Sequence, residues 1–429
     1  MESAIAGSGS RNAESEAVDE THARPSPWGG GIGVHPSQLL FAAACASAVL
    51  VPLLMFEWRH LPMPVDLAVY RQAGYKILHQ VGDLYARGID NAAFSRTLGP
   101  SYWNPRPFTY PPFAALAFAP LTLVGRHGDT IAWTALSMML LTWVTAVAFS
   151  PLLARVQMQR WLALAALIVL VGLSTPVFET LLYGQISLVL AALCLFDCMY
   201  SRRRRGMLVG LATALKLLPG LFIVYFAVTR QWKAALRASL TTLACFAVAA
   251  IFAPHASLHY FTQVELDFHR AGGVTYFSNQ SLNGALHRLG WPSWLWAPVA
   301  VPLGVFGLWR ARIAHQNCSE RAAVALVGLT ILLISPISWE AHGVWVVFAV
   351  GVITNNGRDP RRLAAAGFVG LLFLLRVPQW GAHLVTQGEL WALSGVIEDG
   401  FLLGYLVLLV ALPTSPPDPI QAAPEAKPA

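Results

Sequence analysis

The stretch SRRRRGMLVGLATALKLLPGLFIVYFAVTRQWKAALR, residues 201–237, places one apolar run between two basic segments. Lys and Arg collect in the cytoplasmic loops of membrane proteins, so both flanks are expected on the same side of a bilayer. Lys216 and Pro219 interrupt the run near its middle, where a lysine is costly and a proline breaks a helix. The sequence therefore predicts a broken hairpin over 206–229, with Lys216 at its tip.

The whole chain has the composition of a polytopic membrane protein. Of its 429 residues 56% are hydrophobic and 12% are charged, whereas roughly 25% are charged in a soluble domain. Basic cytoplasmic loops account for the net charge of +7, so we predict no nucleic-acid partner. The five cysteines show no metal-ligand spacing, and we expect neither disulfides nor a zinc site.

Apolar runs long enough to cross, or half cross, a bilayer recur along the chain. Five short basic loops separate them and should all be cytoplasmic, which requires the run 108–125 to be interfacial or re-entrant. We expect an all-α polytopic membrane protein with about 10–12 transmembrane helices and both termini inside. The runs lie near 39–57, 128–153, 161–178, 183–200, 206–229, 237–253, 293–309, 322–335, 340–354, 362–377 and 398–413.

We expect the chain to consist of a transmembrane domain between two disordered tails. Residues 1–37, rich in Gly, Ser and Glu, and residues 414–429, rich in Pro and Ala, are predicted to be disordered cytoplasmic tails. Residues 38–413 form the transmembrane domain, in which 58–127 is the first extracytoplasmic loop with juxtamembrane helices. The first apolar run lacks a basic segment directly before it, so we interpret it as an uncleaved span and not as a signal peptide.

This topology sorts the unusual polar residues onto one face. The inner loops are plain basic anchors, whereas polar side chains among apolar neighbours fall in the outer segments, so we predict an extracytoplasmic active or binding cavity. These residues are Asp66, Tyr70, Arg71, Tyr110, Glu179, Gln185, Lys216, Asn279, Gln280, Asn283, Glu340 and His342.

Asp66 lies in PMPVDLAVYRQAG, residues 62–74, shortly after the first apolar run. In a structural interpretation it is the N-cap of an amphipathic helix that lies on the membrane. In a functional one it is a carboxylate in a partly apolar cleft, where desolvation raises its pKa and suits it to act as a general base. Both roles can hold together.

The other candidates also have two interpretations each. Tyr110 is an interfacial anchor or a ring that stacks on a sugar, and Gln185 caps a helix or binds a hydroxyl. Lys216 needs an anionic partner, either a protein carboxylate or carbonyl or a substrate phosphate. The cluster SNQSLN, residues 278–283, enters a short helix capped by Ser278 or Ser281, or binds sugar hydroxyls. The turn SPISWEAHGVW, residues 335–345, is packing or a carbohydrate or phosphate pocket.

The motifs, in their order along roughly residues 39–413, resemble those of glycosyltransferase family 87. That family holds integral-membrane mannosyltransferases of the GT-C class, similar to the mycobacterial enzymes that add α-1,2-linked mannose to phosphatidylinositol mannosides and lipoarabinomannan. One position departs from the family pattern, since Ser187 stands where an Asn follows GQI. The motifs are DLAVYRQAG, GDLYA, FTYPPFAALAFAPL, YGQISLVLAAL, ALKLLPGLFIVYF, SNQSLNGAL and SPISWEAHGVW.

The resemblance implies a GT-C-type fold and an activity. A hexose, with mannose as the first expectation, would move from a polyprenyl-phosphate donor to a hydroxyl of a glycan or glycolipid acceptor. The protein would also contact membrane lipid. The transfer would invert the anomeric configuration and form an α-1,2 linkage. Asp66 matches the family's catalytic carboxylate and would deprotonate the acceptor hydroxyl. The expected substrate-binding residues are Tyr70, Arg71, Tyr110, Gln185, Lys216, Asn279, Gln280, Asn283, Glu340 and His342.

The leaving phosphate is expected to be met by Lys216, His342 and either Arg71 or Arg270, without a metal or another cofactor, because the outer loops contain no DxD pair. The expected location is the plasma or inner membrane, with the active site on the extracytoplasmic face. Two alternatives stay open. One is a GT-C enzyme that uses polyprenyl-phosphate arabinose or glucose, and the other is a transporter or flippase of lipid-linked sugars, although no internal repeat relates the two halves.

Overall fold

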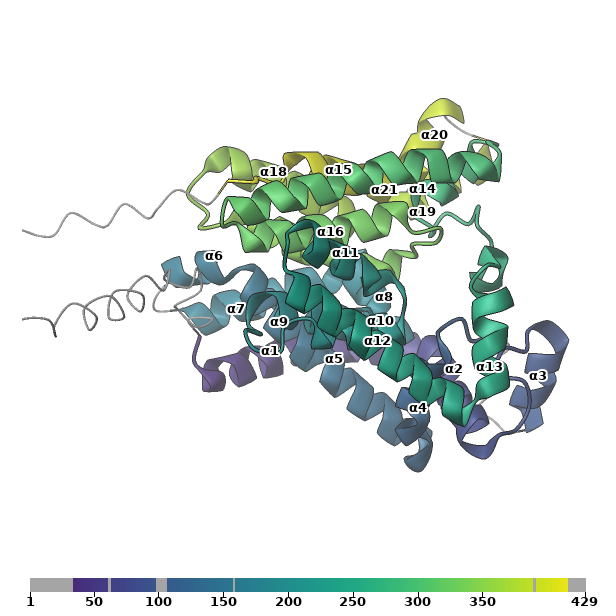
Figure 1. Ribbon diagram of the computed structural model, residues 1–429. Helices are drawn as coiled ribbons and strands as arrows, with labels where there is room; N and C mark the ends of the chain where they lie inside the picture. The colour runs from purple at the N-terminus through teal and green to yellow at the C-terminus, as the bar shows by residue number, and fades with distance from the viewer. Residues whose placement is uncertain (1–33, 61–62, 98–105, 157–158, 389–390, 416–429) are drawn as a thin grey trace, which may run out of the picture.

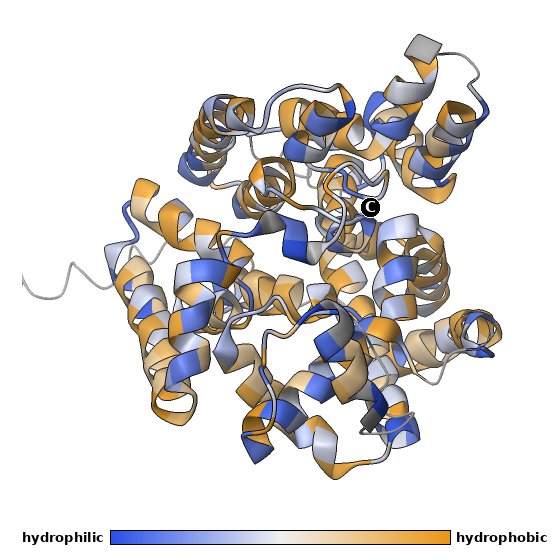
Figure 2. Cartoon of the chain, turned by 90° about the vertical axis from the view of Figure 1, so that its right-hand side faces the viewer, coloured by the Kyte–Doolittle hydropathy of each residue, from blue (hydrophilic) through white to orange (hydrophobic). Residues whose placement is uncertain are grey.

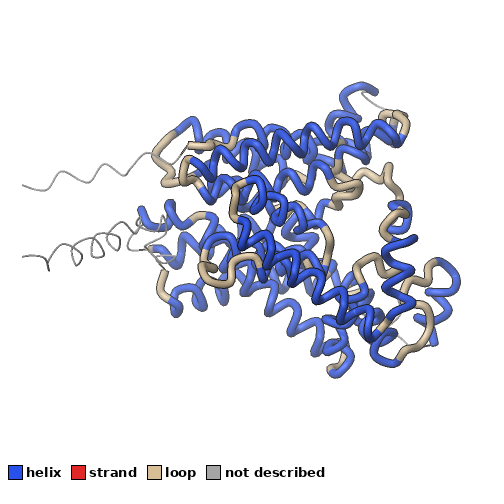
Figure 3. The backbone as a smooth tube through the Cα atoms, in the orientation of Figure 1, coloured by secondary structure: helices blue, strands red, loops and turns tan. Residues whose placement is uncertain are grey.

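The computed structural model describes residues 34–60, 63–97, 106–156, 159–388 and 391–415. Within these ranges the chain forms helices and loops and no strand (Figure 3). One isolated bridge, between Asn279 and Trp339, joins two loops. The predicted all-α membrane fold is therefore confirmed. The predicted tails lie outside the described residues, apart from 34–37 and 414–415, and the first helix already begins at Pro36.

The longest apolar helices match the predicted runs. Among the described helices three are long and apolar enough to cross a bilayer alone: α1 (Pro36–Trp58), α5 (Arg126–Ala148) and α12 (Trp232–Phe252). Two bent pairs would add one span each, α7 (Arg160–Leu173) with α8 (Thr175–Tyr183) at 78°, and α18 (Pro360–Leu374) with α19 (Val377–Gln387) at 53°.

Shorter helices fill the other predicted runs. The total of about 10–12 spans includes them and stays a prediction, because all but α15 (Trp296–Gln316) are too short to cross a bilayer alone and α15 is not among the helices that are both long and apolar enough. They are α9 (Ser187–Met199), α10 (Met207–Leu215), α11 (Leu221–Val228), α15 (Trp296–Gln316), α16 (Glu320–Ile334), α17 (Trp345–Thr354) and α21 (Gly400–Ala411).

The run 108–125 does not form a long helix. It folds as α4 (Pro112–Phe118) followed by a 3₁₀ turn, Ala119–Leu123, because a proline lies in the first turn of each element and cannot donate to a continuous helix. Both pieces pack on α2 (Val65–His79). At Gly74 of α2, a Cβ atom would lie 2.7 Å from the carbonyl oxygen of Phe118, so the close approach needs glycine.

The predicted hairpin over 206–229 is confirmed. Helix α10 ends at Leu215, Lys216 is extended with φ −155° and ψ 130°, and a 3₁₀ turn leads into α11. The two ends of the hairpin lie side by side, since the guanidinium of Arg205 donates a 2.8 Å hydrogen bond to Oε1 of Gln231. Gly206 has φ +103° where the chain touches the carbonyl of Ala234, and only glycine fits there.

The basic loops gather at one end of the molecule. Arg155 of α6 (Ser150–Arg155) donates to the carbonyl of Gly357 at 2.8 Å, and Arg321 donates to the hydroxyl of Ser150 at 2.6 Å. The hydroxyl of Tyr225, near the end of the hairpin, donates to Glu320 at 2.8 Å. We call this the basic end. Such clustering is what the positive-inside pattern requires.

The opposite end carries α2, α3 (Gly88–Thr97) and α13 (Pro254–His259), as Figure 1 shows. Figure 2 views the molecule from this side, where hydrophilic segments are interspersed with hydrophobic ones. The loops that carry the predicted site residues meet here around a cavity, so we call it the cavity end.

The orientation in the membrane can be tested by labelling single cysteines in a chain whose five native cysteines are replaced. We expect Gln263→Cys, at the cavity end, to react with a membrane-impermeant thiol reagent in intact cells. Arg203→Cys, at the basic end, should react only after permeabilisation, because that end is expected to face the cytoplasm. Both side chains are exposed, so either cysteine can react once the reagent reaches it. The opposite labelling pattern would show that the orientation is inverted.

Candidate active site

A cavity of about 540 Å³ opens at the cavity end. This volume lies within the roughly 300–1,000 Å³ that ligand sites occupy. Its walls come from α2, the segment before α4, the end of α8, the hairpin tip, and the loops 260–278 and 335–342. Six predicted site residues line it: Asp66, Tyr70, Tyr110, Gln185, Lys216 and His342.

Asp66 lies in the first turn of α2 and is half-buried. The expectation that it is the N-cap is wrong, because Pro64 holds that position with an extended ψ of 135° and no side chain caps the helix. A carboxylate in the first turn still interacts favourably with the helix dipole. The side chain of Asp66 is therefore free to turn toward Gln185, whose Nε2 donates to Asp66 Oδ2 at 2.7 Å.

Two tyrosines fix the orientation of the Gln185 amide. The hydroxyls of Tyr70 and Tyr110 donate to Gln185 Oε1 at 2.6 and 2.8 Å. A hydroxyl can donate to the amide oxygen but an amide nitrogen cannot accept, so Nε2 must face Asp66. Oδ1 of Asp66 accepts no hydrogen bond from the described residues. One carboxylate oxygen is thus held in place while the other stays available to a ligand.

The local sequence brings these groups together. Tyr70 follows Asp66 by four residues, so both lie on one face of α2. Gly184 ends α8 in the left-handed conformation with φ +68°, and a Cβ there would lie 2.9 Å from Leu67. Glycine therefore permits the tight turn that sets Gln185 against α2.

The environment of Asp66 alters its acidity. Burial raises the pKa of this carboxyl from its usual value to about 6, although the positive charges of Arg106 and Lys216 lower it in part. Such a pKa lies near neutral pH, where a carboxyl can both accept and release a proton. Asp66 therefore has the acidity of a general base.

Lys216 and His342 form a second feature of the cavity. Nζ of Lys216 lies 2.9 Å from Nε2 of His342 and 5.1 Å above the ring of Tyr110. An ammonium only donates, so Nε2 must accept and the imidazole must be neutral with its proton on Nδ1. Burial and the Lys216 charge hold the pKa of His342 well below its usual value. Among the described residues no carboxylate forms an ion pair with Lys216.

Of the two interpretations of Lys216, a protein carboxylate or carbonyl as its partner is therefore not seen in the described part of the chain, and a neutral imidazole lies in that place. A buried cation next to a neutral group attracts an anion. The pair thus leaves a place for a phosphate beside the Asp66 carboxylate.

Arg71 is not on the cavity. Its guanidinium is buried and forms an ion pair with Asp129, in the first turn of α5, and it also donates to the carbonyl of Leu121. Helix α2 carries Arg71 one residue beyond Tyr70, on a different face, so the structure directs it into the α2–α5 contact. Its position fits a structural role. Arg270, the other arginine proposed for the phosphate, does line the cavity.

The amide side chains of the 278–283 cluster are also absent from the cavity lining, although Ser278 lines it. Asn279 and Gln280 are fully buried. Asn279 Oδ1 accepts from the backbone N–H of Ser338 at 2.9 Å, and Gln280 Oε1 accepts from the N–H of Phe401 at 3.0 Å. Nδ2 of Asn283 donates to the carbonyl of Pro336 at 3.1 Å. These side chains join the loop before α14 (Leu282–Arg288) to the 335–340 loop and to α21.

Two further expectations concern this region. Ser281 caps α14, since its hydroxyl accepts from the N–H of Gly284 at 3.0 Å, so that interpretation is confirmed. Glu340 is fully buried outside the cavity lining, where its Oε2 accepts from Gln379 at 2.9 Å. Burial and the nearby Glu179 carboxyl raise the pKa of Glu340.

The cavity contains residues that were not among the predicted site residues. Arg106 and Glu179 line it, together with Tyr183 and Asp267. A sequence signal existed for Arg106, because a basic residue in a predicted outer loop departs from the positive-inside pattern. Glu179 is among the polar residues that the sequence assigns to the outer face but not among the expected substrate-binding residues, and it lines the cavity.

Among the described residues no group of three or more His, Cys, Asp or Glu side chains is arranged to hold a metal ion. The positive side chains on the cavity are Lys216, Arg106 and Arg270. That the reaction needs no metal stays a prediction.

Comparison with known proteins gives a consistent result. The model of a family described as glycosyltransferase family 87 matches residues 108–336. The chain is 32% identical over 403 residues to a polyprenol-phosphate-mannose-dependent alpha-(1-2)-phosphatidylinositol mannoside mannosyltransferase of Mycolicibacterium smegmatis, which covers 87% of this chain and 89% of the relative.

A Mycobacterium tuberculosis protein of the same name is 32% identical over 82% of this chain and 88% of its own length. Another M. tuberculosis relative, a polyprenol-phosphate-mannose-dependent alpha-(1-2)-phosphatidylinositol pentamannoside mannosyltransferase, is 31% identical over 77% of this chain and 75% of its own length. No solved structure matches the chain at a significant level.

The structural role of Arg71 can be tested through its partner. Asp129→Asn removes the carboxylate from a buried ion pair, and such changes cost about 3–5 kcal/mol. We expect a melting temperature several degrees lower in detergent, and partial recovery in Arg71→Met/Asp129→Leu, in which both charges are absent. A double variant no more stable than Asp129→Asn would contradict this assignment.

Proposed function

The chain belongs to glycosyltransferase family 87, and we propose that it transfers mannose from a polyprenyl-phosphate donor to a hydroxyl of a glycolipid acceptor. The donor and the sugar follow from the names of its relatives, which are polyprenol-phosphate-mannose-dependent mannosyltransferases. Those names also specify phosphatidylinositol mannosides and an α-1,2 linkage, and we propose an acceptor and a linkage of that kind. The observation that carries the proposal is the oriented Asp66 carboxylate beside the Lys216–His342 pair in one cavity.

We propose that Asp66 is the general base. Its free oxygen, Oδ1, takes the proton of the acceptor hydroxyl, while the oxygen of that hydroxyl forms a bond to the anomeric carbon of mannose. At the same time the bond from this carbon to the phosphate oxygen breaks, and the phosphate keeps the electron pair. A single displacement through an oxocarbenium-like transition state inverts the anomeric configuration.

The hydrogen bonds around Gln185 support this role. They leave the carboxylate one direction in which to accept a proton, and they place the donor Nε2 on the other oxygen. Alignment of a base in advance lowers the entropic cost of reaching the transition state. Gln185, Tyr70 and Tyr110 are therefore positioning residues for Asp66.

The leaving group is polyprenyl phosphate, and its charge grows as the sugar departs. The ammonium of Lys216 has two N–H donors left after its bond to His342, and these would bind phosphate oxygens. The guanidinium groups of Arg106 and Arg270 line the same cavity and add positive charge.

The cavity end is proposed to face the extracytoplasmic side of the plasma or inner membrane. The basic loops lie at the other end of the molecule, where positive charge marks the cytoplasmic side. A polyprenyl chain in the bilayer would then present its phosphate and sugar to the cavity from the membrane.

The base assignment can be tested with membranes that carry radiolabelled polyprenyl-phosphate mannose and a phosphatidylinositol mannoside. Asp66→Asn keeps the size of the side chain but cannot accept the proton, so we expect a loss of roughly 10²–10⁴-fold in the rate of transfer. Glu179→Gln, a matched change on the same cavity, should retain far more activity. Equal transfer by wild type and Asp66→Asn would refute the role of Asp66, whereas no transfer by wild type would count against the proposed substrates.

A pH profile tests the role of Gln185. Because burial raises the pKa of Asp66 to about 6, its basic form is lost as the pH falls through about 6, and kcat/KM should fall with it. Gln185→Met removes a hydrogen bond that favours the ionised carboxylate, so it should raise this pKa and move the acidic limb to higher pH. Gln316→Met, the same change at an exposed position of the basic end, should leave the limb in place. An unshifted limb in Gln185→Met would contradict the positioning role.

A further inference from the structure

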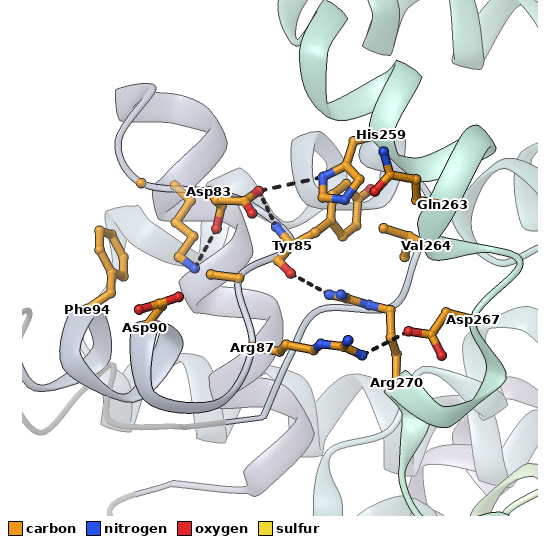
Figure 4. Close-up of a pocket in the computed structure, with 13 residues that line it drawn as sticks. Asp83, Tyr85, Arg87, Asp90, Phe94, His259, Gln263, Val264, Asp267 and Arg270 are labelled. Carbon is orange, nitrogen blue, oxygen red and sulfur yellow. Dashed lines mark hydrogen bonds and ion pairs between the residues drawn. The ribbon is translucent and has the colours of Figure 1, made fainter.

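A second cavity, of about 590 Å³, lies beside the candidate active site at the cavity end (Figure 4). It is formed by two segments far apart in sequence, one from the end of α2 through α3 and one from the end of α13 to Arg270. Its volume, like that of the first cavity, is in the range of small-molecule sites. The mechanism proposed above leaves all but one of its side chains, Arg270, without a role.

The two cavities are adjacent and share part of their walls. Val264, Asp267 and Arg270 line both of them. The hydroxyl of Tyr85, on the wall of the second cavity, donates to the carbonyl of Tyr110 at 3.0 Å, and the guanidinium of Arg270 donates to the carbonyl of Tyr85. Because Arg270 lines both cavities, a ligand that extends from Asp66 beyond this side chain would reach the second cavity.

The charges of the second cavity are balanced. Three cations, Lys76, Arg87 and Arg270, face three carboxylates, Asp83, Asp90 and Asp267. Arg87 and Asp267 form a salt bridge of 2.8 Å (Figure 4). Lys76 donates to the carbonyl of Asp83 at 2.9 Å. A site for phosphate would carry an excess of positive charge, and a site for a metal ion an excess of carboxylates. This lining instead offers alternating donors and acceptors, as a neutral polyol requires.

Two side chains are available to such a ligand. The carboxylate of Asp90, on α3, and the amide of Gln263, on the segment after α13, line the cavity from its two different segments (Figure 4). Both are exposed, and neither makes a hydrogen bond to the described residues. A carboxylate accepts from sugar hydroxyls, and an amide both donates and accepts. The ring of Phe94 on the same wall adds an apolar surface of the kind that packs on a sugar face.

We propose that the second cavity binds sugar residues of the acceptor glycan that lie beyond the sugar carrying the reacting hydroxyl. This inference rests on the proposed function, in which the donor brings one sugar on a lipid phosphate held at Lys216. The donor has no further sugar to place in a neutral polar cavity, whereas a glycolipid acceptor can have several. Asp90 and Gln263 would then set the preference for acceptor length.

The test compares two acceptors on the same lipid, one with a single mannose and one with a manno-oligosaccharide. In Asp90→Ala/Gln263→Ala we expect kcat/KM for the oligosaccharide acceptor to fall roughly tenfold more than for the single-mannose acceptor, mainly through KM, because two hydrogen-bonding groups are lost. Gln316→Ala, at the basic end, is the matched control. Equal changes for both acceptors, or no change for either, would overturn the inference.

A binding measurement separates this inference from the proposed function. Calorimetry in detergent should show that free manno-oligosaccharide binds to the Asp66→Asn protein. The two alanine substitutions should weaken that binding roughly tenfold. If wild type transfers no mannose while this binding is seen and lost as expected, the proposed function fails and the carbohydrate site stands. Unchanged binding in the alanine variant, or preferential binding of an inositol phosphate, would refute the site.

Discussion

The hydrogen bonds of the Gln185 amide connect the parts of the structure on which the candidate site depends. This one side chain joins α2 through Tyr70, the segment before α4 through Tyr110, and the start of α9 through the backbone of Ile186. In a largely apolar domain an unpaired amide would be costly, so its partners are strongly constrained. The same constraint that satisfies the amide also aims the carboxylate of Asp66.

Polar groups buried near the site have two distinct uses. Some satisfy backbone groups where loops pack without regular structure, as Asn279 and Gln280 do for the 338 and 401–402 segments. Others, such as the ammonium of Lys216, have no carboxylate partner in the described part of the chain and lie on an open cavity. A buried polar side chain whose hydrogen bonds are all made within the protein has a structural role, whereas one that keeps a free donor or acceptor facing a cavity is suited to bind a ligand. Residue type alone does not separate the two.

The helical hairpin and the site residues were predictable to different degrees. Charge on both sides of 206–229 required a return to the same side, and the contact between Arg205 and Gln231 confirms it. Lys216 and His342 were expected at the same phosphate, but the hydrogen bond between them was not predictable, because 126 residues separate them and either could have met a carboxylate. Arg71 follows Tyr70 in sequence and was expected to bind substrate, but its side chain forms an ion pair with Asp129 instead.

The sequence by itself determined the membrane class, the helical fold, the segregation of basic loops and the segments that meet at the cavity. These follow from hydrophobicity and charge, which act through the bilayer and depend little on exact contacts. Only the tertiary structure decided which polar side chains face the cavity, how the Gln185 amide is oriented and that a second, charge-balanced cavity adjoins the first. A helix face turns by about 100° per residue, so small rotations of packed helices select which side chains meet, and no local pattern encodes them.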